Sequence, residues 1–389
     1  MSDPLRLARR MAGIAPFHVM ELLARARELE AQGRDIVHME IGEPDFPTPP
    51  AVVEAGRAAL AAGHTRYTPA LGLPELRAAI SDHYRDHYGV AVPLERIAIT
   101  PGASGALQLA LGVLLDPGQK VLMADPGYPC NRHLVRFCNG EPVSVPVGPE
   151  SNYQLHADHL EAHWDAATRA AMVATPANPT GTLLDLGELR ALSDAAGARG
   201  GALLVDEIYH GLVYGAAEVT AATLADNTIV INSFSKYFGM TGWRLGWMVV
   251  PPVLLRAVER LAQNIYLAPS TPAQYAALAA FRPEVLAELK RRRDEFARRR
   301  DLLLPALRGL GFAIPVNPAG AFYLYADSRR CGADSQQLAR ALLEEAGVAV
   351  TPGIDFGDHR PADHLRFAYT TSAARLEEGV ARLARWLAR

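Results

Sequence analysis

The sequence predicts an α/β protein with a three-layer, doubly wound, mostly parallel sheet in a large domain and a smaller α+β domain. Two observations predict this class. In the middle of the chain, short apolar runs alternate with polar loops and helices, which is typical of βαβ units. In the last hundred residues this alternation stops, and strands and helices follow in another order. The length of 389 residues also favours two domains.

The elements expected before the sheet are few. Residues 19–32 form an amphipathic helix that Gly33 ends, because glycine adopts the left-handed conformation that closes helices. Residues 36–41 read as a short strand, and the proline-rich stretch 42–50 cannot continue it. Helices are expected at 52–62 and 75–88, with an ordered loop at 65–74 between them.

The parallel sheet is expected to come next. Each apolar run is followed by a loop that could carry a ligand, because open α/β sheets bind ligands outside the carboxyl ends of their strands. The strand and loop pairs are 97–100 with 101–105, 121–124 with 125–129, 171–174 with 175–181, 202–205 with 206–209, and 228–232 with 233–246. A helix follows the first loop to residue 115, and residues 245–250 form a further strand.

The C-terminal part predicts the smaller domain. A long helix at 283–310 leads into strands at 322–325 and 365–368 and helices at 335–346 and 375–387. The N-terminal segment is expected to pack with this part, because the parallel sheet occupies the middle of the sequence. We expect an N-terminal segment at 1–45, a large domain at 46–285 and a small domain at 286–389.

Composition excludes several function classes. The chain is 49% hydrophobic and 21% charged, and 39 basic against 42 acidic residues give a net charge of −3, so nothing favours nucleic acid or an anionic membrane as a partner. The cysteines Cys130, Cys138 and Cys331 show no CxxC spacing, so neither a disulfide framework nor a zinc site is expected. No apolar run is long enough to span a bilayer, and residues 1–10 lack a signal-peptide core. A cytoplasmic location is expected.

The loop at 233–246 offers the most distinctive chemistry. It contains Lys236, Ser233, Ser235 and Arg244 after an apolar β-branched run. A lysine can form a Schiff base with an aldehyde, and a serine with an arginine can hold a phosphate. An aldehyde that carries a phosphate suggests pyridoxal 5'-phosphate (PLP). The alternative is a surface turn with an ordinary solvated lysine.

The other loops offer matching groups. Residues 101–104 open a helix, whose free amides and positive dipole end suit a phosphate, although no P-loop motif is present. Asp206 could pair with a protonated pyridine nitrogen and keep it charged, or it could cap a helix. Asn178 and Tyr209 could bond the phenolic oxygen of the ring, although Asn-Pro-Thr-Gly is also good turn chemistry. Tyr128 could stack on the ring.

These motifs together resemble a known family. The stretches Asn178-Pro-Thr-Gly, Asp206-Glu-Ile-Tyr and Ser233-Phe-Ser-Lys-Tyr-Phe-Gly-Met-Thr-Gly-Trp-Arg-Leu-Gly come in its order and spacing. Gly42-Glu-Pro-Asp-Phe, Tyr67-Thr-Pro-Ala-Leu-Gly, Pro126-Gly-Tyr-Pro and Leu365-Arg-Phe-Ala complete the set. Over residues 14–387 the chain resembles the class I/II (fold type I) PLP-dependent aminotransferases, nearest to the bacterial aspartate and aromatic aminotransferase group.

The resemblance implies a role for each matched residue. Lys236 would bind PLP covalently as an aldimine and then act as the general base, with Asp206 and Tyr128 as the other catalytic groups. The remaining cofactor contacts would come from Gly102, Ala103, Ser104, Asn178, Tyr209, Ser233, Ser235 and Arg244. Arg366 would bind the substrate α-carboxylate with help from Asn178 and the amide of Gly42. Tyr67 would reach the phosphate in a partner subunit, so a homodimer is implied.

One departure from the family concerns substrate choice. Tyr266 stands where the aspartate-selective branch has an arginine for the distal carboxylate, and a tyrosine cannot form that charged fork. The segment 14–18, expected to cover the site, is apolar except for His18. Neutral or aromatic amino acid donors, with a 2-oxo acid acceptor, are therefore expected. The sequence does not identify which ones.

Other functions and sites stay open at this point. A PLP-dependent cysteine-sulfur β-lyase would keep Lys236, Asp206 and Arg366 on the same fold. A PLP-binding transcription regulator is more remote, because such proteins carry a winged-helix domain before the aminotransferase-like region. The histidine sets 156/159/163 and 83/87 have helical spacing but no accompanying metal-site pattern, so we favour solvated faces over a metal. The basic runs 290–293 and 298–300 favour an interdomain or solvated face.

Overall fold

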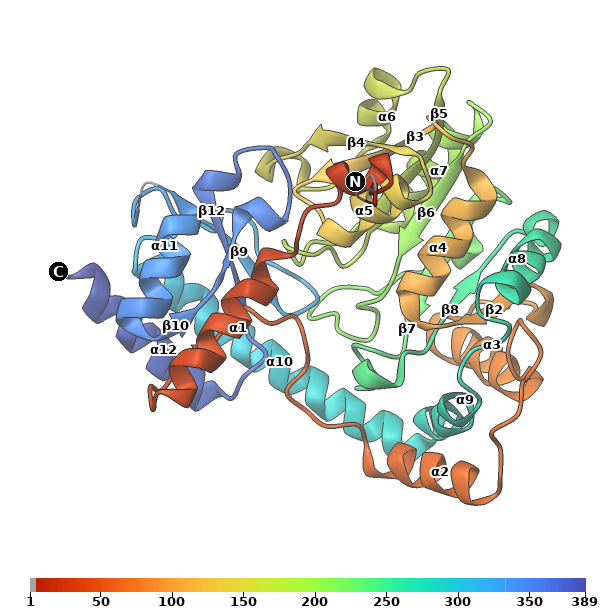
Figure 1. Ribbon diagram of the computed structural model, residues 1–389, viewed down its shortest axis with the longest axis horizontal. Coiled ribbons are helices and arrows are strands. Elements are labelled where there is room, and N and C mark those ends of the chain that lie inside the picture. The colour runs from red at the N-terminus through yellow and green to blue at the C-terminus, as the bar shows by residue number, and fades with distance from the viewer. Residues whose placement is uncertain (1–4, 333) are drawn as a thin grey trace.

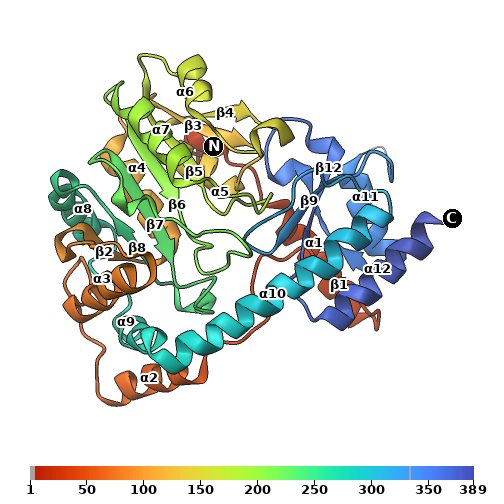
Figure 2. The ribbon, with the colours of Figure 1, turned by 180° about the vertical axis from the view of Figure 1, so that it is seen from behind.

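The protein is described here by a computed structural model that covers residues 5–332 and 334–389. The start of the N-terminal segment predicted at 1–45, and of the stretch 1–10, lies outside the described residues. Figure 1 shows a large body around a twisted sheet and a smaller body beside it, which contains both the α1 helix and the C-terminus. The long helix α10 (Pro283–Gly309) runs from one body to the other, as Figure 2 shows from behind.

The α-helices and strands of the described residues follow in chain order. The other helices are α1 His18–Ala31, α2 Pro50–Ala61, α3 Pro74–Tyr88, α4 Gly102–Leu114, α5 Pro129–Phe137, α6 Ala157–His163, α7 Leu186–Gly197, α8 Pro252–Ile265, α9 Thr271–Leu278, α11 Ser335–Ala341 and α12 Ala373–Leu387. The strands are β1 Val37–His38, β2 Ile97–Thr100, β3 Lys120–Asp125, β4 Glu141–Pro146, β5 Thr168–Ala174, β6 Ala202–Asp206, β7 Thr228–Ser233, β8 Gly246–Val249, β9 Tyr323–Asp327, β10 Val348–Ala349, β11 Thr351–Pro352 and β12 His364–Ala368.

The large sheet has the order β2-β8-β7-β6-β5-β3-β4 among the described residues. Strands β7, β6, β5, β3 and β4 pair in parallel, and β8 alone runs antiparallel to its neighbours β7 and β2. The carboxyl ends of the parallel strands and the start of β8 therefore meet at one edge. The predicted mostly parallel sheet is confirmed, and this edge is the one where ligands are expected.

Two apolar layers cover the sheet because successive strand residues face opposite sides. Ala202 and Leu204 of β6 pack with α4 and α8, whereas Leu203 and Val205 pack with α3, α7 and α9. The strands are apolar at almost every position, as expected when both faces are buried. The three-layer prediction is thus confirmed.

Local sequence explains where many helices begin. Proline is the first residue of α2, α3, α5, α8 and α10, where its fixed φ suits the helix and its missing N–H leaves no donor unpaired. Asp185 caps α7 by accepting from the backbone N–H of Glu188, and Glu188 returns a bond to the N–H of Asp185.

The smaller body combines both ends of the chain. Strands β11, β12 and β9 form an antiparallel sheet, and β1 pairs in parallel with β10. Because β1 comes from the N-terminal segment, the prediction that this segment packs with the C-terminal part is confirmed. The domain boundaries at 45 and 285 remain a prediction.

Some expected elements differ in extent. The strand expected at 36–41 is limited to Val37–His38, because its partner β10 is only two residues long. The helix expected at 335–346 is α-helical to Ala341 and continues as a π-turn, Leu342–Ala346, before Gly347 at φ 66°. Strand β4 was not expected, since it contains Pro142 and Pro146, which an edge strand tolerates.

Candidate active site

A cavity of about 260 Å³ opens at the carboxyl edge of the large sheet, against the smaller body. Its polar lining comes from the carboxyl ends of β6 and β7, from the segments that follow β2, β3, β5, β6 and β7, and from the stretch before β8. The remaining polar side chains are Glu43, Tyr323 of β9 and Arg366 of β12. The sequence-predicted residues that line it are Gly42, Ala103, Ser104, Tyr128, Asn178, Asp206, Tyr209, Ser233, Ser235, Lys236, Arg244 and Arg366. Residues far apart in sequence therefore meet where strand-end geometry predicts.

Lys236 is the amine of this cavity. Its Nζ donates to the backbone oxygen of Gly42 at 2.6 Å. Burial lowers the pKa of Lys236 to about 8; Glu43 acts in the opposite direction, and Arg366 and Arg244 lower it further. A lower pKa leaves more of the amine unprotonated near neutral pH, which is the form that bonds to an aldehyde.

Asp206 ends β6 and is 5% exposed. Its Oδ1 accepts from the backbone N–H of Ile208 at 3.1 Å. Burial raises the pKa of Asp206 to about 6 against that bond, and the charge of Glu207 raises it further. A buried carboxylate with so little protein compensation is suited to a cationic partner such as a protonated ring nitrogen.

Tyr209 and Tyr323 form a hydroxyl pair beside Asp206. The two hydroxyl oxygens lie 2.9 Å apart, and both rings are buried. Burial raises the pKa of Tyr209 well above its usual value, so its phenol stays a neutral hydrogen-bond donor. Such a donor fits the oxygen that the sequence analysis assigned to it.

A phosphate-sized cradle lies at the first turn of α4. Ser104 and the backbone of Ala103 face the cavity together with Ser233, Ser235 and Arg244. Ser233 Oγ donates to Ser235 Oγ at 2.9 Å, and Arg244 Nη1 donates to the backbone oxygen of Thr241 at 2.9 Å. Hydroxyls, helix amides and a guanidinium around one spot form an anion site.

Gly102 keeps this cradle open without lining the cavity itself. Its φ is +70°, and a Cβ there would lie 2.6 Å from Arg244 Nη2. Any side chain would be strained and would displace the arginine. The close approach of Arg244 therefore explains why a glycine is needed at position 102.

Arg366 is buried on the opposite side of the cavity. Nη1 donates to Asn178 Oδ1 at 3.0 Å, and Nη2 donates to the backbone oxygen of Glu40 at 2.6 Å. Its guanidinium lies 4.3 Å from the ring centre of Tyr323 and 4.9 Å from that of Phe356. The buried Nε–H has no partner among the described residues.

The N-terminal segment supplies an apolar wall. Phe17, Val19 and Met20 line the cavity, and the ring of Phe17 meets that of Tyr128 edge-on at 6.4 Å. Asp355 holds this wall in place, because its carboxylate accepts from the backbone N–H groups of His18 and Val19, both at 2.9 Å.

Several functional residues were missed by sequence reasoning. Tyr323 contacts both Tyr209 and Arg366, and Glu43, Leu107, Cys130 and Leu134 also line the cavity. Tyr323 follows the expected strand start, where alternation could have placed it on the cavity face. No sequence signal separates the others from ordinary core or surface residues.

Two predicted residues lie away from the cavity of their own chain. Tyr67 is 81% exposed on the loop before α3. Tyr266 ends α8 with its hydroxyl buried and without a hydrogen-bond partner in the described part of the chain. A hydrogen bond connects the two segments that contain these residues, because the hydroxyl of Thr271 donates to the backbone oxygen of Arg66 at 2.7 Å.

The histidine set 156/159/163 and the basic runs of α10 make contacts within the protein. His159 Nδ1 accepts from the backbone N–H of His156, and His163 bonds the oxygen of His159, so these histidines serve the ends of α6. Among the described residues, no group of three or more His, Cys, Asp or Glu is arranged to hold a metal. In the basic run of α10, Arg299 pairs with Asp45 at 2.8 Å and Arg292 bonds the oxygen of Pro47.

The donor set fits PLP. An anion cradle, a buried carboxylate of raised pKa and an amine of lowered pKa lie around one cavity, which matches the phosphate, the ring nitrogen and the aldehyde. The described residues contain no helix long and apolar enough to cross a membrane.

Comparison with known proteins agrees with this geometry. The family model "Aminotransferase class I and II" matches residues 34–383. A valine–pyruvate aminotransferase of Mycobacterium tuberculosis is 41% identical over 378 residues, or 97% of each chain. The aspartate/prephenate aminotransferase of Thermus thermophilus is 36% identical, over 98% of this chain and 99% of the relative.

Solved structures show the same fold. The crystal structure of an aminotransferase from Mycobacterium tuberculosis superposes with a TM-score of 0.95 at 41% identity, covering 98% of this chain and 99% of that one. Aspartate aminotransferase from Thermus thermophilus with maleate gives 0.92 at 36% identity, with coverage of 98% and 99%. These proteins are aminotransferases and give the lyase alternative no support. The chain belongs to the class I and II aminotransferases and is a PLP-dependent enzyme of that family.

Proposed function

We propose that the cavity residues divide the work of transamination as follows. Ser104, Ser233, Ser235, Arg244 and the first amides of α4 hold the phosphate. Bound PLP supplies an aldehyde that takes up the amino group and a ring that withdraws electrons. Asp206 holds the ring-nitrogen proton, and Asn178 and Tyr209 bond the ring oxygen.

Lys236 and Arg366 act on the substrate in this proposal. Lys236 Nζ moves the proton between the substrate Cα and the cofactor, which its lowered pKa favours because the neutral amine is a base. Arg366 and Asn178, which bond each other and both line the cavity, orient the α-carboxylate. Tyr128 stacks on the ring, and Phe17 packs against Tyr128 and excludes water from that side.

We further propose a donor with a neutral, apolar side chain. One observation carries this choice: the cations among the described lining residues are Lys236, Arg244 and Arg366, and all three already have a role. Apolar side chains, among them Phe17, Met20, Leu107 and Leu134, make up much of the remaining lining. The valine–pyruvate specificity in the name of the 41% identical relative points the same way.

A donor screen tests the substrate class. We expect kcat/KM to be higher for valine, methionine or phenylalanine than for aspartate or glutamate, with pyruvate or 2-oxoglutarate as acceptor. Turnover should require the acceptor. A strong aspartate preference would show that a cation reaches the site from elsewhere and would overturn the apolar assignment, while leaving the aminotransferase reaction intact.

A homodimer in the cytoplasm is proposed as the working form. Two observations support Tyr67 as a residue that acts in the partner's site: it is exposed, and it does not line the cavity of its own chain. Ile265 and Leu267, on either side of Tyr266 in the sequence, are also exposed apolar residues, as is typical of an interface.

Mixed dimers test this sharing. Lys236→Ala and Tyr67→Ala chains are each expected to be inactive or impaired alone. If Tyr67 acts in the partner's site, a mixed dimer contains one site with both native residues and regains activity. If Tyr67 acts in its own chain, mixing restores nothing. Light scattering on the same samples reports whether dimers form at all.

A further inference from the structure

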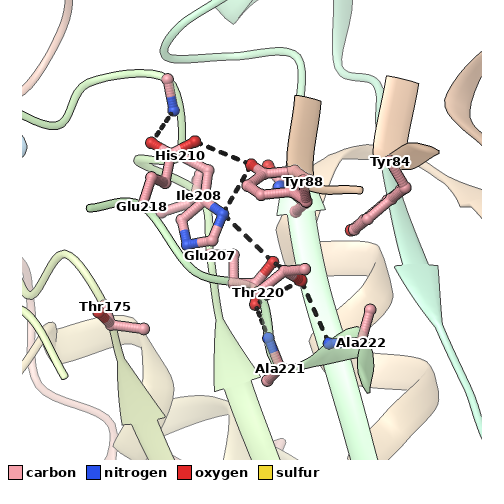
Figure 3. Close-up of polar contacts among 12 residues, drawn as sticks. Tyr84, Tyr88, Thr175, Glu207, Ile208, His210, Glu218, Thr220, Ala221 and Ala222 are labelled. Atoms are coloured by element: carbon pink, nitrogen blue, oxygen red, sulfur yellow. Dashed lines mark hydrogen bonds and ion pairs between the residues drawn. The ribbon is translucent and has the colours of Figure 1, made fainter. Parts of the chain in front are cut away.

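A second cluster of polar side chains lies where the chain after β6 meets the end of α3 (Figure 3). It consists of Glu207, His210, Glu218, Thr220 and Tyr88, and is called the Glu207 cluster below. Glu207 is 0% and His210 6% exposed. None of these side chains has a role in the function proposed above.

Glu207 ties two segments together. Its Oε1 accepts from the backbone N–H of Ala221 at 2.7 Å, and both oxygens accept from the hydroxyl of Thr220 at 3.0 Å. Hydrogen bonds from backbone amides to a buried carboxylate are short and strong. The chain directly after β6 is therefore fixed to the segment at 220–221.

Glu218 ties the other end of the same turn. Its Oε2 accepts from the backbone N–H of Gly211 at 2.6 Å, and its Oε1 accepts from the hydroxyl of Tyr88 at 3.0 Å and contacts His87 at 2.8 Å. His210 lies between the two carboxylates: its Nδ1 is 3.4 Å from Glu207 Oε2 and 2.9 Å from Tyr88 Oη. Tyr88 in turn donates to Glu218, so the two carboxylates are connected through His210 and Tyr88.

The turn between these two ties carries cavity residues. Asp206, Ile208 and Tyr209 line the cavity, whereas Glu207 and His210 point to the cluster. The turn is thus held from behind at residues 207 and 211, and the residues that face PLP lie between or directly beside these points. Loss of the hydrogen bonds at Glu207 or Gly211 would therefore displace Tyr209, which lies between them.

We propose that Glu207 and Glu218 are positioning residues for the cofactor, which fix the turn 207–211 so that Asp206 and Tyr209 meet the PLP ring. This inference rests on the proposed function and adds to it. His210 and Tyr88 link the two ties into one unit with α3.

The charges of the cluster support a role beyond packing. The fully buried carboxylate of Glu207 and the mostly buried one of Glu218 are costly, and apolar replacements of such groups often leave proteins as stable or more stable. His210 offsets part of this cost: against burial, its charge helps to lower the pKa of Glu218 to about 2. The charge of Glu207 raises the pKa of Asp206, and that of His210 lowers it, so the cluster also acts on the cofactor carboxylate through space.

The test compares Glu207→Ala with Glu207→Gln and with a control, Asn227→Ala. Gln keeps an acceptor for the Ala221 N–H and matches the volume. Asn227 bonds the backbone oxygens of Ser193 and Gly201 before β7, at the opposite end of the sheet, so its loss lowers stability without touching the turn. Dialysis of each holoenzyme against graded PLP gives the dissociation constant, and visible spectra give the absorption maximum.

We expect Glu207→Ala to weaken PLP binding about tenfold or more, the scale at which residues behind the direct ligands act. Its absorption maximum should shift and its kcat should fall for every donor with little change in KM. Glu207→Gln should restore most of the affinity, and Asn227→Ala should bind PLP as wild type does, at a similarly lowered melting temperature. A Glu207→Ala enzyme that binds PLP within twofold of wild type would overturn the proposal.

Glu218→Ala decides the matter if Glu207→Ala does not fold. This variant removes the tie to Gly211 and keeps the Glu207 bonds, so we expect weaker PLP binding and a shifted spectrum again. Unchanged PLP affinity and spectrum would leave the cluster a purely structural one. Failure of the proposed function would look different, because wild-type enzyme would then not hold PLP on Lys236.

Discussion

Asp206 and Glu207 are neighbours at the end of β6, both are buried, and they face opposite sides of the sheet. Glu207 accepts bonds from Ala221 and Thr220 and lies 3.4 Å from His210. Asp206 accepts from Ile208 alone among the described hydrogen bonds. Burial raises the pKa of both carboxyl groups, that of Asp206 to about 6. Two carboxylates that are buried to a similar degree thus differ in how many protein groups offset the cost of burying their charge.

The contrast separates a site from its support. A buried carboxylate that the chain itself compensates belongs to the scaffold, since nearly all buried polar groups are hydrogen-bonded. A buried carboxylate that the chain leaves poorly compensated is suited to a partner that is not part of the chain. The same distinction applies to Lys236, whose Nζ meets one backbone oxygen, and to Arg299, which pairs with Asp45 and Glu295.

The largest effect is expected for Lys236→Ala. Both the covalent attachment and the proton carrier disappear, so turnover should fall at least about 1,000-fold while weak PLP binding remains. Borohydride reduction of wild-type enzyme should fix PLP on the peptide that contains Lys236. The other two lysines of the sequence, Lys120 and Lys290, serve as controls, and labelling of either in place of Lys236 would refute the assignment.

Next in size is the pair Asp206 and Glu207. Asp206→Ala should reduce kcat at least about 100-fold, because the ring nitrogen loses its counter-charge, and Asp206→Glu should be milder. Asp206→Asn should stabilise the full chain stripped of PLP at pH 7. The raised pKa means that the ionised carboxylate destabilises the fold above pH 6, by about 1–3 kcal/mol, and that this penalty disappears on acidification below about pH 4.

Urea unfolding at pH 7 measures this difference. Burial also raises the pKa of Glu207, but His210 and the bonds from Ala221 and Thr220 oppose that shift. Glu207→Gln should therefore stabilise the chain less than Asp206→Asn does. If the two variants stabilised the chain equally, the contrast between the two neighbours would be wrong.

The sequence predicted the first half of this contrast and missed the second. Asp206 ends an apolar strand, and Asn178 and Lys236 lie in the loops after two others, so the rule for carboxyl edges places them together without any coordinates. Tyr88 and Glu218 lie in a helix end and a loop, and only tertiary packing brings them to Glu207. Tyr323 and Phe17 come from the smaller body, whose position against the sheet no local pattern specifies. The edge strand β4 was missed because its prolines break strand propensity.

A third prediction concerns Arg366, a cation that is compensated except at Nε. Arg366→Ala should raise KM for all amino acids together, because each contains the α-carboxylate. The loss is of order 2–5 kcal/mol in kcat/KM for a buried charged pair. Tyr266→Arg should change only the ratio of acidic to neutral donors. Steady-state kinetics with aspartate, glutamate, phenylalanine and methionine on one preparation separates the two, and an Arg366→Ala effect limited to acidic donors would contradict its role.

The smallest effect is expected at Glu40, which lies between the two cases. Glu40 is 0% exposed, its Oε1 lies 2.7 Å from His38 Nδ1, and its Oε2 has no partner among the described residues. The hydrogen bond to Glu40 raises the pKa of His38 to about 9 against the effect of burial, with a smaller contribution from Glu30. Glu40 is therefore half compensated, and its compensation depends on the proton of His38.

The sign follows from the raised pKa. A folded-state pKa above the unfolded value of about 6.5 means that the pair stabilises the fold fully below pH 6.5 and that this stability is lost as the pH rises through 9. We expect a loss of about 1–2 kcal/mol in the free energy of unfolding between pH 6 and pH 10, smaller than the shift alone implies because His38 is partly exposed. His38→Gln should flatten this part of the profile. If the variant showed the same dependence of unfolding free energy on pH as wild type, the pair of His38 and Glu40 would not cause it. Glu40 would then belong with Asp206 among the carboxylates that have too few protein partners.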